Sequence, residues 1–276
     1  MYSEYNAELA RKWLDFLSTN ENAKARVEKA MGNSYEFSFD TLEKVRSYIP
    51  LIRDYSSTPT KTIINARSSQ GLASELTCHG FDRACVLNFA DYRVPGGKFL
   101  EGSMVQEESL CHTSGLYPIL DSFRESYDAR INSLNKGAYT HTGIYAEQVP
   151  FWVNGRDSYC DILTFAAVNY RSLQRSRATQ AEIDNHKKVM KERQEIAYLV
   201  PKLFGNVDIL ILGAWGCGIF KNETYDVAQS WVDCTKKYPN LYKAVYHPIF
   251  RGGEKMDIFQ YIYDAAGMDV VVERTG

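Results

Sequence analysis

The chain has 276 residues and a formal net charge of −2, and 45% of its residues are hydrophobic while 24% are charged. This composition is typical of a soluble globular protein, and the length suits one domain with an extension. The small net charge excludes a global basic field, so we expect direct binding neither to nucleic acid nor to a membrane.

The sequence has neither an apolar run of transmembrane length nor a charged-then-apolar leader, so we expect no membrane span and no secretory signal. Its cysteines lack Cys-x-x-Cys spacing, and we interpret them as buried thiols rather than disulfides or zinc ligands. They are Cys78, Cys85, Cys111, Cys160, Cys217 and Cys234. The histidines form no ligand spacing either. A cytoplasmic protein without a metal or other cofactor is therefore predicted.

The first part of the chain reads as helical. Leu9, Trp13 and Phe16 recur at spacings of four and three, which predicts one apolar helix face within residues 5–31. A capping-box pattern then begins at Asp40 and opens a short helix that Pro50 ends or kinks. Because this segment carries no chemistry of its own, we predict that residues 1–58 form a helical extension packed on a main domain, residues 59–276.

Strands and helices alternate along the main domain. Short apolar runs bounded by turn residues predict strands at 61–65, 84–90, 161–168, 207–212 and 241–246, and residues 139–153 read as extended or as a hairpin. Helical patterns fall at 69–79, 106–116 (with Pro118 at its end), 178–199, 222–237 (capped by Asn222) and 256–264. This alternation implies a sheet covered by helices on both faces.

The segment that follows the strand at 84–90 contains the clearest candidate functional residues of the sequence. A Pro-Gly-Gly turn at 95–97 follows it, and two adjacent carboxylates, Glu107 and Glu108, open the next helix. Glycines let backbone approach a ligand without a side chain in the way. A second glycine-rich loop, residues 213–218, follows the strand at 207–212 and offers backbone N–H groups to a phosphate. Ordinary tight turns and a solvated helix start are the alternatives.

Together these motifs resemble the signature of the microbial-type poly(ADP-ribose) glycohydrolases, a branch of the macrodomain superfamily. Residues 88–110 read Asn-Phe-Ala-x-x-x-x-Pro-Gly-Gly-x-Phe-Leu-x-Gly-x-x-x-Gln-Glu-Glu-Ser-Leu, and the likeness continues at 114–118, 163–169 and 212–222. Ordered motifs far apart in one chain are a specific signal, whereas a lone Gly-Gly turn is weak.

The resemblance implies a three-layer α/β/α macrodomain-like fold with a mixed central sheet, preceded by the helical extension. It also implies hydrolysis of the ribose glycosidic bond in poly(ADP-ribose) or a mono-ADP-ribosylated target, with release of ADP-ribose and no cofactor. The expected partners are ADP-ribose, poly(ADP-ribose) or an ADP-ribosylated macromolecule.

By the same resemblance, Glu108 is the catalytic acid and Glu107 holds a ribose hydroxyl. The leaving oxygen needs a proton, which a carboxylic acid supplies, and repulsion between neighbouring carboxylates favours protonation of one of them. Phe220 resembles the family aromatic that packs against the distal ribose. The expected substrate-binding residues are Asn88, Asp91, Gly96, Gly97, Lys98, Gln106, Asn169, Gly213, Ala214, Trp215, Gly216, Cys217, Gly218, Ile219 and Phe220.

Two positions depart from the family pattern. Lys98 stands where the family usually has a third glycine, and Asp91 where it usually has asparagine. The lysine has three open interpretations: it pairs with a phosphate, narrows the cleft, or pairs with a catalytic glutamate. The carboxylate that holds adenine in many macrodomains is also not evident after the strand at 61–65. The alternative function is therefore an ADP-ribose-binding module with little or no turnover.

Overall fold

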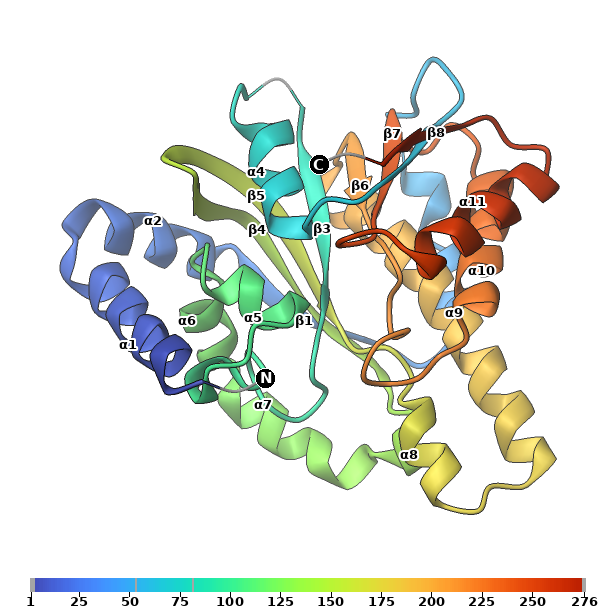
Figure 1. Cartoon of the computed structure of the whole chain (residues 1–276), viewed down its shortest axis with the longest axis horizontal. Helices are drawn as coiled ribbons and strands as arrows, with labels where there is room; N and C mark the ends of the chain where they lie inside the picture. The colour runs from blue at the N-terminus through green and yellow to red at the C-terminus, as the bar shows by residue number, and fades with distance from the viewer. Residues whose placement is uncertain (1–2, 53, 81, 275–276) are drawn as a thin grey trace.

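The computed structural model describes residues 3–52, 54–80 and 82–274, and the strands of that part form a single eight-stranded sheet (Figure 1). The strand order is β1-β4-β5-β3-β6-β7-β2-β8, and β4 runs antiparallel to both neighbours while the remaining pairs are parallel. The strands are β1 Ser34–Phe39, β2 Lys61–Asn65, β3 Ala84–Phe89, β4 His141–Val153, β5 Arg156–Phe165, β6 Ile209–Ile211, β7 Ala244–Pro248 and β8 Val270–Glu273.

Helices cover both faces of this sheet. They are α1 Glu4–Thr19, α2 Glu21–Gly32, α3 Leu42–Arg46, α4 Ser69–Thr77, α5 Gln106–Cys111, α6 Leu116–Asp121, α7 Arg124–Ala129, α8 Tyr170–Arg175, α9 Gln180–Gly205, α10 Thr224–Lys237 and α11 Glu254–Ala265. Buried side chains of α3, α9, α10 and α11 form the core on one face, and those of α1, α2, α4, α5 and α6 form the core on the other. The predicted α/β/α fold with a mixed sheet is confirmed.

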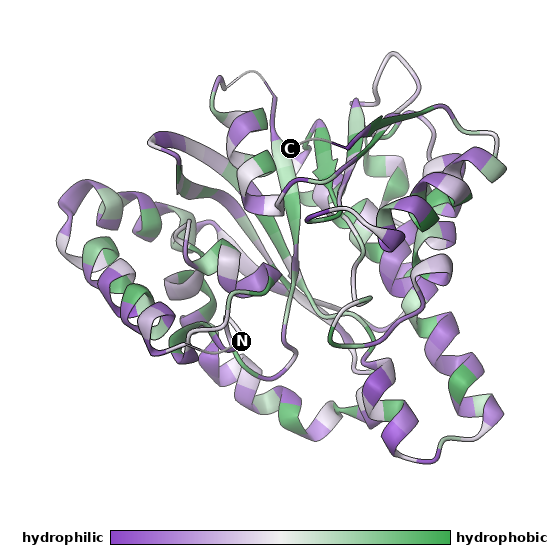
Figure 2. Cartoon of the chain, in the orientation of Figure 1, coloured by the Kyte–Doolittle hydropathy of each residue, from purple (hydrophilic) through white to green (hydrophobic). Residues whose placement is uncertain are grey.

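Burial explains why the predicted strands were readable from the sequence. The central strands are hydrophobic along most of their length, whereas the helices carry apolar and polar faces (Figure 2). In β6, for example, each residue of Ile209–Ile211 is buried. A strand covered on both faces has no polar side to alternate with, so it appears as a short continuous apolar run.

The N-terminal segment contributes a strand as well as helices. We predicted only helices before residue 58, but β1 joins the sheet edge antiparallel to β4. Tyr35, Phe37 and Phe39 alternate along β1, and their rings lie 5.3, 5.7 and 6.5 Å from the ring of Phe204 on α9. This alternation was the strand signal in the sequence. The division into an extension and a main domain stays a prediction.

Several helix boundaries differ from the prediction, and α9 for example runs to Gly205 rather than to residue 199. The side chain of Thr41, not Asp40, caps α3 by accepting the N–H of Lys44 at 3.3 Å. The helix predicted at 106–116 is two helices, because α5 ends at Cys111 and α6 begins at Leu116. Pro118 lies in the first turn of α6, where a proline removes no helical hydrogen bond. Strand β8 at the sheet edge was not predicted.

The sheet brings distant motifs together at one end. β3, β5 and β6 are neighbours and parallel, so their carboxyl ends meet at the same edge of the sheet. The loops that leave those ends carry residues 90–105, 166–169 and 212–223, which include the glycine motifs. Ligands of open α/β sheets bind outside the carboxyl ends of the strands, so a ligand-binding site is expected at this edge.

Candidate active site

A cavity of about 220 Å³ lies between the loops at this edge. The predicted residues that line it are Asp91, Gly97, Lys98, Gln106, Glu107, Glu108, Trp215, Gly216, Gly218, Ile219 and Phe220. The lining also contains residues that we had not predicted: Phe89, Ala90, Ser103, Val105 and Ala167. Both glycine motifs and both carboxylates therefore share one cavity.

Glu107 is held from two sides at the wall of the cavity. Its Oε1 accepts a hydrogen bond from Asn88 Nδ2 at 3.1 Å, and its Oε2 accepts one from the backbone N–H of Asp91 at 2.8 Å. The side chain is almost fully buried. Burial raises the pKa of Glu107 well above its usual value and outweighs the Asp91 hydrogen bond, which lowers it, while the charge of Glu108 raises it further. A protonated carboxyl is the form that this environment favours.

This raised pKa predicts how stability depends on pH. The folded protein keeps a proton on Glu107 that the unfolded chain loses near pH 4.3, so the stabilisation is complete below that pH and is lost as the pH rises through the folded-state pKa. Glu107→Gln should remove this dependence. We therefore expect the unfolding temperature of the variant, relative to the parent, to be higher at pH 8 than at pH 5. Parallel pH profiles in thermal unfolding would contradict the assignment.

Glu108 lies beside the Gly-Gly turn. It is also buried, and its Oε1 accepts the backbone N–H of Lys98 at 3.0 Å. Gly97 has a φ of +57°, and a Cβ placed on it would lie 2.8 Å from Glu108 Oε1 and 2.9 Å from Glu107 Oε2. Glycine at 97 thus has two local causes, the left-handed backbone and the space taken by both carboxylates. The turn positions the acids directly.

The amide side chains of Gln106 and Asn88 hold the segment that carries the carboxylates against β3. β6 pairs with β3 only as far as Val86, and beyond that point Gln106 takes over the hydrogen bonding of the β3 backbone. Its Oε1 accepts the N–H of Phe89 at 2.8 Å, and its Nε2 donates to the carbonyl of Leu87 at 2.9 Å. Asn88 is fully buried and bonds to Glu107 and also to Thr164. Both side chains fix the start of α5 to β3.

The second glycine loop is held by Asn222. We predicted that Asn222 caps α10, but the N-cap is Glu223, whose side chain makes no capping bond. The Nδ2 of Asn222 instead donates to the carbonyls of Val168 at 2.7 Å and Gly216 at 3.3 Å. A Cβ on Gly216, whose φ is +76°, would lie 2.5 Å from that same nitrogen. The side chain of Asn222 therefore joins the loops that follow β5 and β6.

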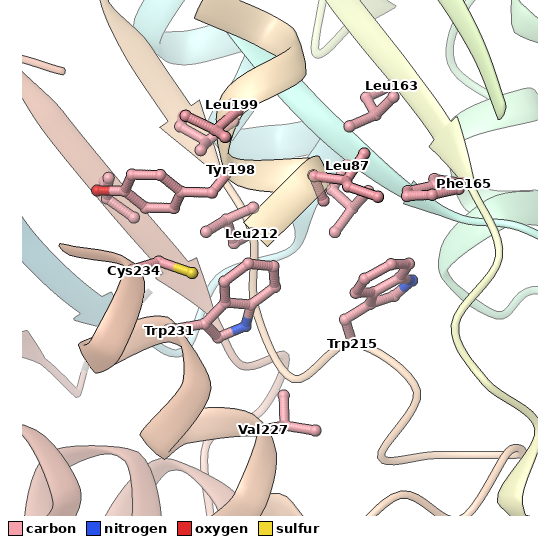
Figure 3. Packing of buried hydrophobic residues seen from close by; sticks show 14 of the residues in the cluster. Leu87, Leu163, Phe165, Tyr198, Leu199, Leu212, Trp215, Val227, Trp231 and Cys234 are labelled. Carbon is pink, nitrogen blue, oxygen red and sulfur yellow. The ribbon is translucent and has the colours of Figure 1, made fainter. Parts of the chain in front are cut away.

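Trp215 connects this loop to the core. It lines the cavity and is fully buried, with its ring 5.7 Å from Phe165 and 6.2 Å from Trp231 (Figure 3). The Nε1 of Trp231 donates to the carbonyl of Gly213 at 3.1 Å. Two large rings thus fix the path of the loop, so its cavity-facing glycines are held by packing against the sheet.

Comparisons with known proteins agree with this geometry. The sequence model of the family "Microbial-type PARG, catalytic domain" matches residues 18–154, close to half of the chain. The match confirms that the chain resembles the microbial-type poly(ADP-ribose) glycohydrolases (PARG). The matched model is that of a catalytic domain, which supports an enzyme of the glycosyl hydrolase class. Among curated proteins, none matches the sequence.

Solved PARG structures share the fold. The PARG of Thermomonospora curvata has 22% sequence identity and a TM-score of 0.80, with 94% of this chain and 100% of that chain covered. The same enzyme bound to the inhibitor ADP-HPD has 21% identity and a TM-score of 0.79, with 94% and 99% covered. The PARG of Deinococcus radiodurans, in complex with ADP-ribose, has 24% identity and a TM-score of 0.76, with 87% and 97% covered. At these identities the likeness is one of fold.

The two departures from the PARG family pattern have visible local roles. The Nζ of Lys98 lies 3.1 Å from Glu101 Oε2, and both side chains are more than half exposed. This contact directs the ammonium toward Glu101. Asp91 uses its Oδ1 to accept the N–H groups of Arg93 at 2.7 Å and Val94 at 3.1 Å, which closes the turn after β3. Neither departure disrupts the loop that carries the glycines.

Several predicted residues lie outside the lining of the cavity and support it. Asn169 caps α8 by accepting the N–H of Ser172 at 3.1 Å, and a Cβ on Gly96 would lie 2.6 Å from the ring of Tyr117. The others outside the lining are Asn88, Gly213, Ala214 and Cys217. Phe220 lines the cavity as predicted, with Tyr139 6.5 Å away in edge-on contact. Ala167, which we did not predict as a site residue, lies in the family-like motif at 163–169, and that motif could have indicated its place in the cavity.

Helix α1 braces the same loop, although most of it precedes the matched PARG segment. Asn6 Nδ2 donates to the carbonyl of Gly102 at 3.3 Å, and Trp13 Nε1 donates to the carbonyl of Ser114 at 3.1 Å. A Cβ on Gly102, whose φ is +81°, would lie 2.2 Å from the carbonyl oxygen of Ser3. The N-terminal helix therefore contacts the chain on both sides of α5.

A larger groove, about 680 Å³, lies between α3, α9 and α10. Its lining contains none of the predicted site residues, and many of its charges are paired within it. Lys187 lies 2.9 Å from Asp226, and Arg46 and Lys237 each lie 2.8 Å from Glu195. Size alone would favour this groove, but the convergence of carboxylates and glycine loops places the candidate active site in the smaller cavity.

Nowhere in residues 3–52, 54–80 and 82–274 do three or more His, Cys, Asp or Glu side chains gather in a way that would hold a metal ion. No helix within those ranges is both long and apolar enough to cross a membrane.

Proposed function

We propose that the protein hydrolyses the ribose glycosidic bond of poly(ADP-ribose), or of a mono-ADP-ribosylated target, and releases ADP-ribose with Glu108 as the general acid. The observation that carries the proposal is that Glu107 and Glu108, which lie against Gly97, line the same cavity as Gly216 and Gly218. The PARG complexes with ADP-ribose and with ADP-HPD support this choice of ligand.

The two carboxyls have different surroundings and so suit different roles. Both oxygens of Glu107 are engaged by the protein, and burial favours its protonated form. A neutral Glu107 orients the substrate by donating its O–H to a ribose hydroxyl oxygen. Glu108 is tied to the protein through Oε1 and the N–H of Lys98. Its Oε2 has no hydrogen-bond partner within the described ranges, which leaves it for the leaving oxygen.

The reaction then proceeds by general acid–base catalysis. Glu108 as a carboxylic acid gives its proton to the leaving oxygen while the bond to the anomeric carbon breaks, and positive charge spreads onto the ribose ring. Water adds to the anomeric carbon and gives a proton to the Glu108 carboxylate, which restores the acid. The products are free ADP-ribose and the acceptor hydroxyl.

Two measurements on the unmodified chain test the proposal. Release of ADP-ribose from labelled polymer and from a mono-ADP-ribosylated protein measures turnover, and calorimetry with ADP-ribose measures binding. We expect both turnover and binding. Binding without release from either substrate would favour the ADP-ribose-binding module instead, and absence of both would reject an ADP-ribose site.

Lys98 is expected to strengthen binding of an anionic ligand. Lys98 lines the cavity, and its ammonium lies 3.1 Å from Glu101 Oε2, a contact that does not involve the catalytic carboxylates. Lys98→Ala should weaken ADP-ribose affinity a few-fold, and more at low salt than at high salt, because screening weakens exposed charge interactions. Lys98→Gly tests obstruction, since it should raise turnover only if the side chain narrows the cleft. Unchanged affinity and rate in both variants would mean that lysine in place of the family glycine at position 98 affects neither binding nor turnover.

We also propose a cytoplasmic location. All six cysteines are free thiols in the structure, and five of them are buried. Free thiols are typical of reducing compartments. Fractionation of cells that express the chain, with a mobility assay of its thiol state, would test this, and recovery in an oxidising compartment would contradict it.

A further inference from the structure

Tyr139 has an unusual backbone conformation beside the cavity. Its φ is +61°, in the left-handed region that aromatic residues rarely occupy. Such conformations persist only where surrounding contacts enforce them, and they cluster at functional sites. The contacts that hold Tyr139 in this conformation therefore indicate a part of the structure whose position matters for function.

Arg193 of α9 makes those contacts. Its Nη2 donates to the carbonyl of Ala138 at 2.7 Å and to the carbonyl of Thr140 at 3.1 Å, the residues on either side of Tyr139. Its Nη1 donates to the carbonyl of Ala166 at 3.2 Å. The side chain is fully buried, and each hydrogen bond that it makes within the described ranges goes to a backbone carbonyl. Hydrogen bonds from a charged donor are stronger than neutral ones.

The two segments that Arg193 joins both support the cavity wall. The ring of Tyr139 stacks on Tyr92 at 4.1 Å with an interplanar angle of 8°, and meets Phe220 edge-on at 6.5 Å. Its hydroxyl accepts a hydrogen bond from Asn169 Nδ2 at 3.2 Å. Phe220 lines the cavity, and so does Ala167, the residue after Ala166. Arg193 itself does not line the cavity.

We propose that Arg193 is a positioning residue for substrate binding. It clamps residues 138–140 to residue 166, and through Tyr139 it sets the position of Phe220. The inference rests on the proposed function for its ligand, ADP-ribose. Because the clamp acts on the segments that carry Phe220 and Ala167 and makes no contact with Glu107 or Glu108, it governs affinity and KM more than the bond-breaking step.

The test compares Arg193→Met with Lys202→Met. Lys202 is a second buried cation of α9, and its Nζ also donates to a backbone carbonyl, that of Val207 at 3.2 Å. Lys202 lies outside the cavity lining. Arg193→Met should weaken ADP-ribose affinity in calorimetry at least about tenfold and raise KM similarly, with a smaller fall in kcat. Lys202→Met should lose stability with affinity unchanged. Parental affinity and KM in folded Arg193→Met would overturn the proposal.

Tyr139→Asn provides the second arm, in case Arg193→Met does not fold. Asparagine tolerates a positive φ, so this variant removes the ring while the backbone keeps its conformation. It should lose affinity about as much as Arg193→Met, and the double variant should lose little more than either single variant. Parental affinity in Tyr139→Asn would also overturn the proposal.

Hydrogen–deuterium exchange separates this inference from the proposed function. If the parent binds no ADP-ribose, the proposed function fails, but the clamp still predicts faster exchange at residues 138–140 and 166–169 in Arg193→Met than in Lys202→Met. Equal exchange in the two variants would reject the clamp whatever the ligand.

Discussion

Replacing Glu108 with glutamine is expected to reduce turnover at least about a hundredfold, because general acid–base catalysis typically contributes on the order of 10²–10⁴-fold. Glutamine keeps the shape of the side chain, and its Oε1 can still accept the N–H of Lys98. It supplies no acidic proton to the leaving oxygen. ADP-ribose affinity should therefore stay within a few-fold of the parent while the rate falls. Single-turnover assays with labelled polymer, beside calorimetry, measure the two effects separately.

Glu107→Gln is the matched comparison, since it changes the neighbouring carboxyl in the same way. It should lose rate through misplacement of the ribose, and it should also lose affinity because the role proposed for Glu107 is to hold a ribose hydroxyl. A loss of rate without a loss of affinity therefore distinguishes the acid from the orienting carboxyl. We would abandon the acid assignment if Glu108→Gln released ADP-ribose at the parental rate.

The candidate site was largely predictable because its residues lie in two short motifs, each placed after a buried strand. Parallel neighbours such as β3 and β6 deliver their following loops to one edge, so the motifs had to meet once the strands were recognised. The sequence did not distinguish contact with ligand from support of the protein. Asn88 and Gln106 were expected to bind substrate, which stays a prediction, and the structure shows that their amides also bond to Glu107 and to the β3 backbone. An amide side chain suits either role, so its contacts within the protein become visible only in the tertiary structure.

Other features depend on contacts between distant segments. Asn222 stands before a helix, as a cap would, yet its amide joins the loops after β5 and β6. Arg193 reads as one more charge on a long helix, and the sequence carries no sign of the carbonyls that surround it. β1 is different, because its alternation of aromatic residues was readable and was overlooked between two helical patterns. Local patterns therefore identified most of the elements, and long-range packing determined the contacts of several side chains.

Replacing Gly97 with valine is the second change with a large expected effect. A Cβ at this position would meet oxygens of both Glu107 and Glu108 within 3 Å, and the φ of +57° disfavours a β-branched residue. Misplacement of a reacting group by about 1 Å can cost roughly 10²-fold in rate. We therefore expect turnover to fall by at least about a hundredfold, with a smaller loss of ADP-ribose affinity and a lower unfolding temperature.

Gly218→Val separates this effect from crowding of the ligand. Gly218 lines the same cavity, but a Cβ there would meet no atom within 4 Å, so valine fills open space without disturbing the carboxylates. It should weaken ADP-ribose binding while the unfolding temperature stays near that of the parent. Gly32→Val, at the end of α2 and also with open space around its Cβ, is the control for adding a side chain away from the cavity. Parental affinity in Gly218→Val would show that the loop after β6 does not approach the diphosphate of ADP-ribose. Parental turnover in Gly97→Val would show that the Gly-Gly turn does not position the catalytic carboxyls.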